Sequence, residues 1–150
     1  MNLSKHFTLE EMERSDYAIR HNIDNTPSPE ESLNLQALCI FVLEPLREII
    51  KRPLFVSSGF RCKEVNLGIG GSLRSQHQEG KAADIIAPEM TIDELFDMAC
   101  KFVPYDQIIH EFGRWVHVSY NGDANRHQQF KAIKKDGKTE YIPLKQKDTQ

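Results

Sequence analysis

The sequence predicts an α+β fold in which N-terminal helices pack on a mainly antiparallel sheet. Helix signals come first along the chain, and strand signals dominate the second half, with one further helix between the strands. Residues 1–150 are expected to form a single domain, because 150 residues with 39% hydrophobic side chains suffice for one core.

Two polar turns begin the expected N-terminal helices. Thr8 precedes Glu11 by three residues, which is the spacing of a capping box and predicts a short helix. Ser28 and Glu31 repeat this spacing, and Pro29 stands at the first helical position, where its fixed φ suits a helix.

The second of these helices is expected to bury one face. Its apolar residues recur at steps of three and four, namely Leu35, Leu38, Val42, Leu46 and Ile49. Pro45 lacks an amide donor and should kink this helix.

The middle of the chain is expected to alternate between strands and a loop. Residues 54–57 predict a short buried strand, and the glycine-rich, polar segment 66–80 predicts a loop. Residues 81–88 predict a second strand, which a proline closes. A third capping box at Thr91 predicts a helix that ends near Phe102.

The last third of the chain is expected to contain two hairpins. Residues 105–112 and 115–120 are rich in β-forming side chains and are expected to pair antiparallel. Asp136 and Gly137 form a strong two-residue turn signal between two further strands. This second hairpin could add to the edge of the sheet or form a dimer contact.

Charge and hydropathy exclude several classes of partner. The net charge of -3 gives no general attraction to nucleic acid or to an anionic membrane. No apolar run approaches the roughly 20 residues of a membrane span, and the N-terminus lacks the apolar core of a signal peptide. We therefore expect synthesis in the cytoplasm without a signal peptide.

The three cysteines argue against a disulfide framework or a thiolate zinc site, because they are odd in number and far apart. Cys39 and Cys100 lie in expected helices and should pack as small apolar side chains. Cys62 follows Arg61 in an expected loop and could be exposed.

Three polar side chains stand out against apolar sequence or lie close to it. Asp84 lies inside the apolar strand segment, and His117 lies between two valines that point to the opposite face. His77 lies in the polar loop, seven residues before Asp84. A buried carboxylate is costly unless it is paired or bound to a metal. Each residue alone also fits an ordinary ion pair or a satisfied core histidine.

Together, His77, Asp84 and His117 form a three-ligand zinc set. Such a set leaves a fourth position for water or substrate, as is typical of catalytic zinc. Zinc lowers the pKa of bound water to about 7, so the chemistry also needs a base that passes a proton to the leaving amine.

Residues 75–84, with the pattern S-x-H-x-x-G-x-A-x-D, resemble the zinc-binding signature of the zinc D-alanyl-D-alanine carboxypeptidase family. That family shares its fold with the N-terminal domain of hedgehog proteins. "VSSGFRC" and "EFGRWVHVSY" are similar to the family segments before the signature and around the last histidine ligand. The resemblance covers about residues 3–120. The segments "LSKHFTLEEMERSD" and "IDNTPSPE" are similar to a bacterial and phage-encoded branch of the family. Residues 121–150 carry no family motif and are interpreted as a C-terminal hairpin extension.

The resemblance implies roles for individual residues. It makes the two histidines and the aspartate named above the ligands of a Zn²⁺ ion. It makes Arg61 a candidate for holding a substrate carbonyl or carboxylate through its planar fork of donors, with a structural salt bridge as the alternative. Ser75 either hydrogen-bonds substrate or makes a local turn bond, and Gly80 is expected to let the loop turn near the metal.

The catalytic base is where the chain departs from this family. Many members carry Glu or Asp three residues before the last histidine ligand, where this chain has Arg114. Glu111, six residues before His117, is therefore the preferred base, with His110 in reserve and Asp106 as a further option. Adjacent side chains of a strand point to opposite faces, so the hairpin register decides between Glu111 and His110.

The function implied by the resemblance is zinc-dependent hydrolysis of peptide bonds in peptidoglycan stem peptides. The enzyme would be a D-Ala-D-Ala carboxypeptidase or an endopeptidase of the endolysin type, with D,D or L,D specificity. To reach the cell wall it would need a holin-like release partner or delivery on a phage tail. The alternatives are a non-catalytic zinc-containing cell-wall-binding module, a virion structural module, and a metal-free ion pair between Asp84 and His117.

Overall fold

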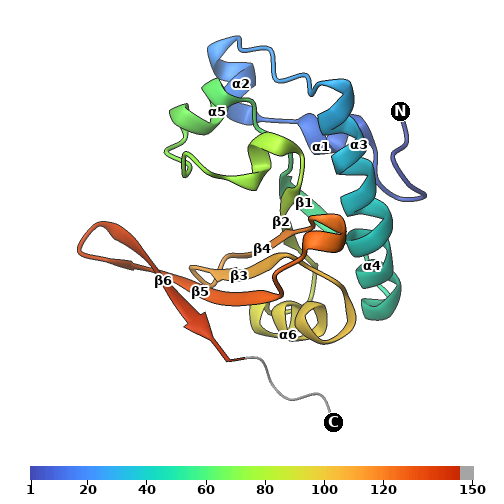
Figure 1. Ribbon diagram of the computed structural model, residues 1–150, viewed down its shortest axis with the longest axis vertical. Coiled ribbons are helices and arrows are strands. Elements are labelled where there is room, and N and C mark those ends of the chain that lie inside the picture. The colour runs from blue at the N-terminus through green and yellow to red at the C-terminus, as the bar shows by residue number, and fades with distance from the viewer. Residues whose placement is uncertain (146–150) are drawn as a thin grey trace.

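A six-stranded sheet with the order β1-β2-β4-β3-β5-β6 forms the centre of the molecule (Figure 1). The computed structural model describes residues 1–145. The strands are β1 (Phe55–Ser58), β2 (Ala82–Ile86), β3 (Gln107–Glu111), β4 (Trp115–Ser119), β5 (Gln128–Lys135) and β6 (Lys138–Leu144). Strands β3 and β5 run parallel, and the other neighbouring strands run antiparallel. The predicted α+β class with a mainly antiparallel sheet is confirmed.

Along the chain, most of the helical segments come before β1 or lie between β1 and β3. They are α1 (Leu9–Glu13), α2 (Asp16–His21), α3 (Pro29–Leu38), the π-helical turn η1 (Cys39–Leu43), α4 (Glu44–Ile50), α5 (Lys63–Gly68), the 3₁₀ turn η2 (Gln76–Glu79), α6 (Ile92–Phe102) and the 3₁₀ turn η3 (Gly122–Ala124). In Figure 1, α3 and α4 run along one side of the molecule, and α6 lies against the sheet.

The main core lies between one face of the sheet and the helices α3, α4 and α6. Strands β2 and β4 contribute Ala83, Ile85, Val116 and Val118 to it, all with no exposed surface. Because side chains alternate along a strand, the residues between them face the other way. That second face carries the polar residues described below.

The predicted helix starts are present. Thr8 accepts a hydrogen bond from the Glu11 amide at 3.1 Å, and Ser28 and Glu31 form a complete capping box. Thr91 forms a second complete box at the start of α6, which ends at Phe102 as expected.

Pro45 divides the predicted second helix into three pieces. The turn before it widens into the π-helical η1, in which the Glu44 amide donates to the Cys39 carbonyl, five residues back. A π-helical turn contains one more residue than an α-helical turn. The helix can therefore continue past Pro45, which has no amide hydrogen to donate. After this insertion Ile50 is buried, whereas Ile49, which the periodicity had predicted inward, is only partly buried.

The prediction of a continuous loop over residues 66–80 is wrong, because α5 ends inside it and η2 lies within it. Helix α2, which Ser15 caps by accepting a hydrogen bond from the Ala18 amide, was not predicted. Helices of one or two turns carry little periodic signal and depend on packing for their stability. Asn66 in α5, for example, is fully buried and donates to the Ser72 carbonyl at 2.9 Å.

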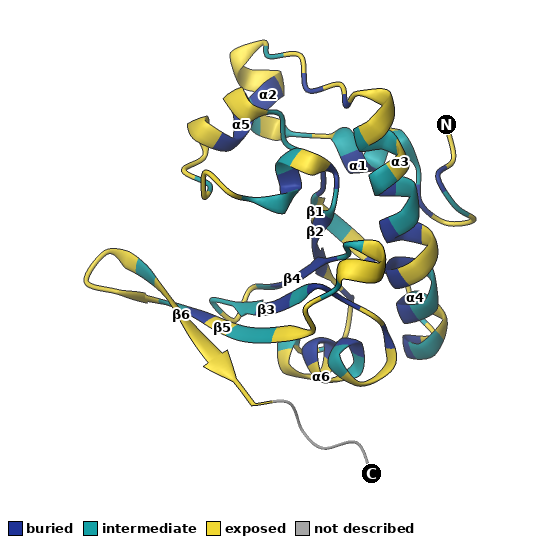
Figure 2. Ribbon diagram, in the orientation of Figure 1, coloured by how far each residue is buried: buried dark blue, intermediate teal, exposed yellow. Residues whose placement is uncertain are grey.

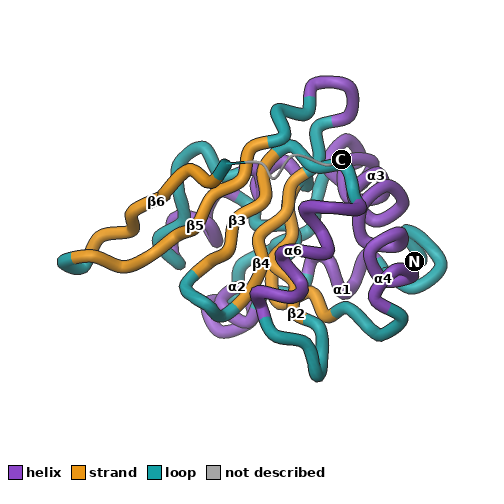
Figure 3. The backbone as a smooth tube through the Cα atoms, turned by 90° about the horizontal axis from the view of Figure 1, so that it is seen from below, coloured by secondary structure: helices purple, strands orange, loops and turns teal. Residues whose placement is uncertain are grey.

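The C-terminal hairpin adds to the sheet edge, one of the two arrangements expected for it. Asp136 and Gly137 both have positive φ, 52° and 77°, as a type I′ turn requires. Strand β5 pairs with β3, and β6 forms the outer edge. The hairpin reaches beyond the helices (Figure 3), and most of its outer part is exposed (Figure 2).

Among residues 1–145, none of the three cysteines forms a disulfide. Cys39 is buried, and burial raises its pKa to about 12, which suits an unreactive packing residue. Cys62 and Cys100 are partly buried against the core. In the part of the chain that the structure describes, no helix has the length and apolar character needed to cross a bilayer.

Candidate metal centre

The pairing of β2 with β4 places Asp84 directly opposite His117. Both side chains lie on the face of the sheet that points away from the main core, because the valines on either side of His117 point into that core. Both are nevertheless buried, with 4% and 8% of their surface exposed. Their environment is therefore dry enough that neither can rely on water for its hydrogen bonds.

The short turn η2 brings His77 to the same place. Ser75 caps this turn by accepting a hydrogen bond from the His77 amide at 3.3 Å. Gly80 ends the turn at φ +73°, and a side chain there would meet the Glu31 carbonyl at 2.4 Å. The chain can therefore turn this close to α3 only with glycine at this position.

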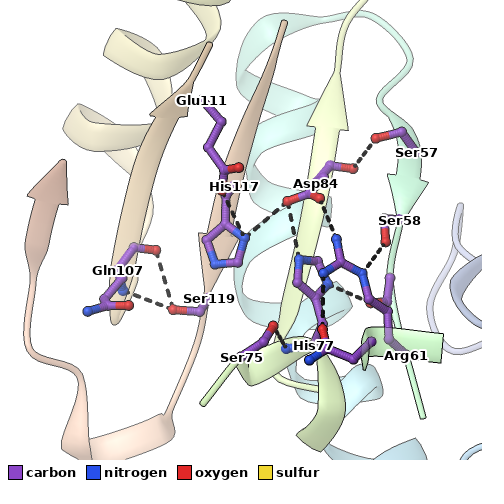
Figure 4. Close-up of polar contacts among 12 residues, drawn as sticks. Ser57, Ser58, Arg61, Ser75, His77, Asp84, Gln107, Glu111, His117 and Ser119 are labelled. Carbon is purple, nitrogen blue, oxygen red and sulfur yellow. Dashed lines mark hydrogen bonds and ion pairs between the residues drawn. The ribbon is translucent and has the colours of Figure 1, made fainter. Parts of the chain in front are cut away.

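The three side chains meet at one carboxylate oxygen (Figure 4). The His117 Nδ1 atom lies 3.0 Å from Asp84 Oδ1, and the His77 Nε2 atom lies 3.3 Å from the same oxygen. The structure thus brings together all three residues that the resemblance implied as ligands.

This group has the chemistry of a zinc site. One donor atom from each residue lies within 4.8 Å of the others, and a tetrahedral ion with bonds of 2.0–2.1 Å has ligands roughly 3.4 Å apart. The Gly59 carbonyl accepts from His77 Nδ1 at 2.6 Å, which fixes the proton on that nitrogen and leaves the Nε2 lone pair free to bind a metal. The residues present therefore fit a divalent cation with two imidazoles and one carboxylate.

The electrostatics of the group favour an ionised Asp84. Burial alone would raise its pKa, but the two imidazoles hold the pKa of Asp84 well below its usual range. Burial lowers the pKa of His77. Burial also acts to lower the pKa of His117, but Asp84 and Glu111 outweigh it and raise that pKa. An anionic oxygen between two imidazoles is an arrangement that a bound cation would stabilise further.

Arg61 holds the second oxygen of the same carboxylate. Its Nη2 donates to Asp84 Oδ2 at 3.1 Å, its Nε donates to Ser58 Oγ at 2.9 Å, and its Nη1 contacts Asn66 Oδ1 at 3.4 Å. The β1 register is irregular between Val56 and Ser58, which sets Ser58 opposite Asp84. The structure thus shows the salt bridge that was the alternative for Arg61, although the guanidinium also lines the cavity described below.

Strand register distinguishes the two adjacent base candidates. In the β3–β4 pair Ile109 lies opposite His117, so Glu111 shares the face of His117, and its Oε1 lies 3.7 Å from His117 Nδ1. His110 points to the other face, where its Nε2 lies 2.6 Å from Asp93 Oδ1 and its ring packs edge-on against Phe96. Burial raises the pKa of Glu111, and Asp84 adds to this effect.

Asp106 lies apart from the metal ligands. It is fully buried, and it accepts hydrogen bonds from Arg126 at 2.8 and 2.9 Å and from Gln76 at 2.9 Å. These bonds support the loop that carries His77, since Gln76 is the neighbouring residue. A structural role fits this carboxylate better than that of a base.

A large cavity opens over the centre. Its volume is about 1270 Å³, and its lining includes the three metal-ligand candidates, Arg61 and Glu111. The opposite walls come from the loop that precedes η2 and from the C-terminal hairpin, which contributes Tyr141. No local sequence pattern connects Asn66 or Tyr141 with the histidines, so neither residue was predicted.

A buried His-Asp-His group beside a carboxylate, in the lining of a wide cavity, fits the type of centre found in metallohydrolases. A family model described as peptidase M15 matches residues 5–119. The chain therefore belongs to the peptidase M15 family, which is of the zinc D-Ala-D-Ala carboxypeptidase type, as the resemblance in the sequence predicted. Peptidases of this family are zinc-dependent.

The match ends at the last residue of β4, so β5 and β6 lie outside it. No curated protein matches the chain in sequence.

Proposed function

We propose that this protein is a zinc-dependent peptidase that hydrolyses peptide bonds in peptidoglycan stem peptides. The observation that carries the proposal is the position of Glu111. Its carboxylate lies 3.7 Å from His117, at the wall of a cavity that also contains the buried donors of His77 and Asp84. Family membership supports the peptidase class.

His77 Nε2, Asp84 Oδ1 and His117 Nδ1 are the atoms that would hold the ion. Zinc bound by three such ligands supplies a Lewis acid, which lowers the pKa of a coordinated water to about 7 and polarises a carbonyl. The Gly59 carbonyl and the Arg61 guanidinium orient two of these ligands through hydrogen bonds. Such outer contacts are worth roughly 10- to 100-fold in metal affinity or activity.

Glu111 is placed to act as the general base. Its carboxylate accepts the proton of the attacking water and then delivers it to the nitrogen of the leaving amine. Burial raises its pKa, which makes it a better proton acceptor than an exposed glutamate. His110 is less suited to this role, because its side chain lies on the opposite face of β3 and contacts Asp93.

Arg61 combines two roles in this proposal. Three of its five N–H groups contact Ser58, Asn66 and Asp84, which fixes the guanidinium at the wall of the cavity. The remaining two are available to the carbonyl oxygen of the peptide as negative charge develops on it. Ser75 positions His77, because its hydroxyl caps the turn η2 that carries this histidine.

The decisive experiment is incubation of the zinc-loaded protein with defined peptidoglycan fragments, with the products identified by mass. Loss of a terminal D-alanine would indicate a carboxypeptidase, and cleavage within the peptide would indicate an endopeptidase. The Glu111→Gln variant keeps the size of the side chain and is expected to lose activity by about 10²- to 10⁴-fold while it retains zinc.

The same experiment tests the non-catalytic alternatives. A cell-wall-binding or virion structural module would sediment with purified wall material or assemble into particles, and it would release no product even with zinc. In that case Glu111→Gln would change neither binding nor assembly. The route to the wall, through a holin-like partner or a phage tail, belongs to the same proposal and is tested by adding the protein to intact and to permeabilised cells.

A further inference from the structure

The C-terminal hairpin forms one wall of the cavity above the metal ligands. It lies outside the residues that the family model matches, so family membership assigns it no role. Both of its strands contribute to the cavity lining, through Phe130, Lys131, Ala132, Ile133, Lys134, Thr139 and Tyr141.

Strand register shows which of these side chains share the face of Glu111. Glu111 pairs with Ala132 across β3–β5, and Ala132 pairs with Tyr141 across β5–β6. Side chains of directly paired residues lie on the same face of a sheet. Neighbouring strands lie about 4.8 Å apart, so the backbones of Glu111 and Tyr141 are separated by roughly 10 Å. Only the methyl group of Ala132 stands between the two side chains along this row.

The surroundings of Tyr141 agree with this placement. Burial raises the pKa of its phenol, and the negative charges of Glu111 and Asp84 raise it further. The phenol therefore keeps its proton more firmly than an exposed tyrosine does. Its O–H can donate to a carbonyl of a peptide that lies in the cavity.

Lys134 lies farther along the same face of β5, two residues beyond Ala132. Its Nζ donates to Thr139 Oγ1 at 2.9 Å and lies 5.3 Å from the centre of the Phe112 ring. These neutral contacts hold the ammonium group without cancelling its charge. No carboxylate of the described residues forms an ion pair with it.

The charges of the cavity lining favour an acidic ligand. Two of its arginines, Arg61 and Arg126, are neutralised by Asp84 and Asp106. The other arginines and lysines of the lining, including Lys134, have no ion-pair partner among residues 1–145, although the whole chain has a net charge of -3. A local excess of positive charge on an acidic protein indicates selection for negative charge in the ligand.

We propose that the C-terminal hairpin selects the substrate: Tyr141 contacts the peptide beside the scissile bond, and Lys134 binds a carboxylate of the same peptide. This inference rests on the proposed peptidase function and deepens it, because it makes the substrate an acidic peptide. Stem peptides with a free α-carboxylate on their glutamyl residue belong to this class, and that group can be amidated without changing either end of the peptide.

The contact of Tyr141 is tested by steady-state kinetics of the zinc-loaded protein on a stem peptide. Tyr141→Ala is expected to raise KM about 10-fold with a smaller change in kcat, and Tyr141→Phe shows how much of this comes from the hydroxyl group. The matched control is Ile142→Ala, the neighbouring residue, which pairs with Lys131 and points to the opposite face. Equal effects of Tyr141→Ala and Ile142→Ala, or none, would overturn the assignment.

The carboxylate contact is tested with two probes, L-Ala-γ-D-Glu-L-Lys-D-Ala-D-Ala and its D-isoglutamine counterpart. Lys134→Ala is expected to weaken binding of the first peptide about 3- to 5-fold, as fits an exposed charge pair, and to leave the second unchanged. Lys138→Ala removes a hairpin lysine that does not line the cavity and should affect neither peptide. An equal loss for both peptides, or no loss, would contradict a contact between Lys134 and the glutamyl α-carboxylate.

Binding measured by calorimetry beside hydrolysis separates this inference from the proposed function. Binding with an acid preference that depends on Lys134, but without cleavage, would refute the peptidase and support the hairpin assignment. Cleavage by the wild type that neither Lys134→Ala nor Tyr141→Ala alters would support the peptidase and refute the hairpin assignment.

Discussion

The sheet is built differently at its centre and at its C-terminal edge. Strands β2 and β4 are buried on both faces, with the core on one side and the metal-ligand candidates on the other. Strand β6 is mostly exposed on both faces, and β5 is buried mainly at Ala132, where it joins β3. In the centre the paired residues Asp84 and His117 are buried and also supply two of the metal-ligand candidates. At the edge most side chains are exposed, so they can contact a ligand without disturbing the core.

The largest effect is expected when the centre loses a ligand. Asp84→Asn removes the anionic oxygen between the two imidazoles and leaves Arg61 without its carboxylate, so zinc affinity should fall at least about a hundredfold and hydrolysis with it. Zinc content after dialysis is the measurement. Asp93→Asn is the matched control, because Asp93 also contacts a histidine but lies on the other face of the sheet. Equal zinc content in the two variants would contradict the site.

Metal binding is also expected to stabilise the fold. Zinc at a thousand times its Kd should add about 4 kcal/mol to the free energy of unfolding, because the ligands come from three separate segments that meet only in the folded chain. Urea titration with and without a chelator measures this difference. A chelator that left the transition unchanged would show that no ion is bound.

Replacing a leucine by alanine should lower the free energy of unfolding more in the core than at the edge of the sheet. Leu46→Ala, in α4, removes a side chain with no exposed surface and should cost about 2–5 kcal/mol of unfolding free energy. Leu144→Ala, in β6, removes one that is 37% exposed and should cost less than about 1 kcal/mol. Urea titration of both variants gives the comparison, and similar losses would mean that β6 belongs to the cooperative core.

The ionised Asp106 side chain is expected to contribute to the free energy of unfolding in a pH-dependent way. Hydrogen bonds from Arg126 lower its pKa from 3.8 to about 2 in the folded protein. Its contribution is therefore present above about pH 4 and is lost as the pH falls toward 2. Because Arg126 is half exposed, we expect only about 1–2 kcal/mol. Asp106→Asn should be less stable than the wild type at pH 7, and the gap should close near pH 2. If the difference in stability between Asp106→Asn and the wild type did not change with pH, the loss would come from packing and not from the charge of Asp106.

Small effects are also expected at the two hairpin turns, where glycine has positive φ and open space around it. Gly113 joins β3 to β4, and Gly137 joins β5 to β6. Alanine at either position should cost about 1–2 kcal/mol from backbone strain. Only Gly113→Ala should lower kcat, because its turn fixes Glu111 against His117. A loss of kcat in Gly137→Ala of the same size would place the outer hairpin in the chemistry itself.

Local signals predicted most of the elements. Thr8, Ser28 and Thr91 each cap a helix through a bond three residues away, and Asp136 with Gly137 forms its turn without distant help. Such features depend on a few neighbouring residues, so the sequence states them directly. The parallel pairing of β5 with β3 has no such local signal, and it was not predicted.

In the candidate site, too, some residues could be predicted from local sequence and others depend on the tertiary structure. The proximity of the three ligand candidates could be predicted because each stands out against its own segment or belongs to the signature. The choice between Glu111 and His110 could not, because it depends on the register of β3 against β4. The contacts of Arg61 with Ser58 and Asn66 also depend on an irregular strand and a short helix that tertiary packing creates.

Strand β3 would be the rim of the sheet if the chain stopped after β4. With β5 in place, the Glu111 backbone has a ladder on each side, to Trp115 in β4 and to Ala132 in β5. Amides held in this way exchange slowly with solvent, and a strand held on both sides cannot fray. The C-terminal segment therefore also restrains the backbone of Glu111, which in the proposed peptidase would keep this carboxylate within reach of the reacting bond.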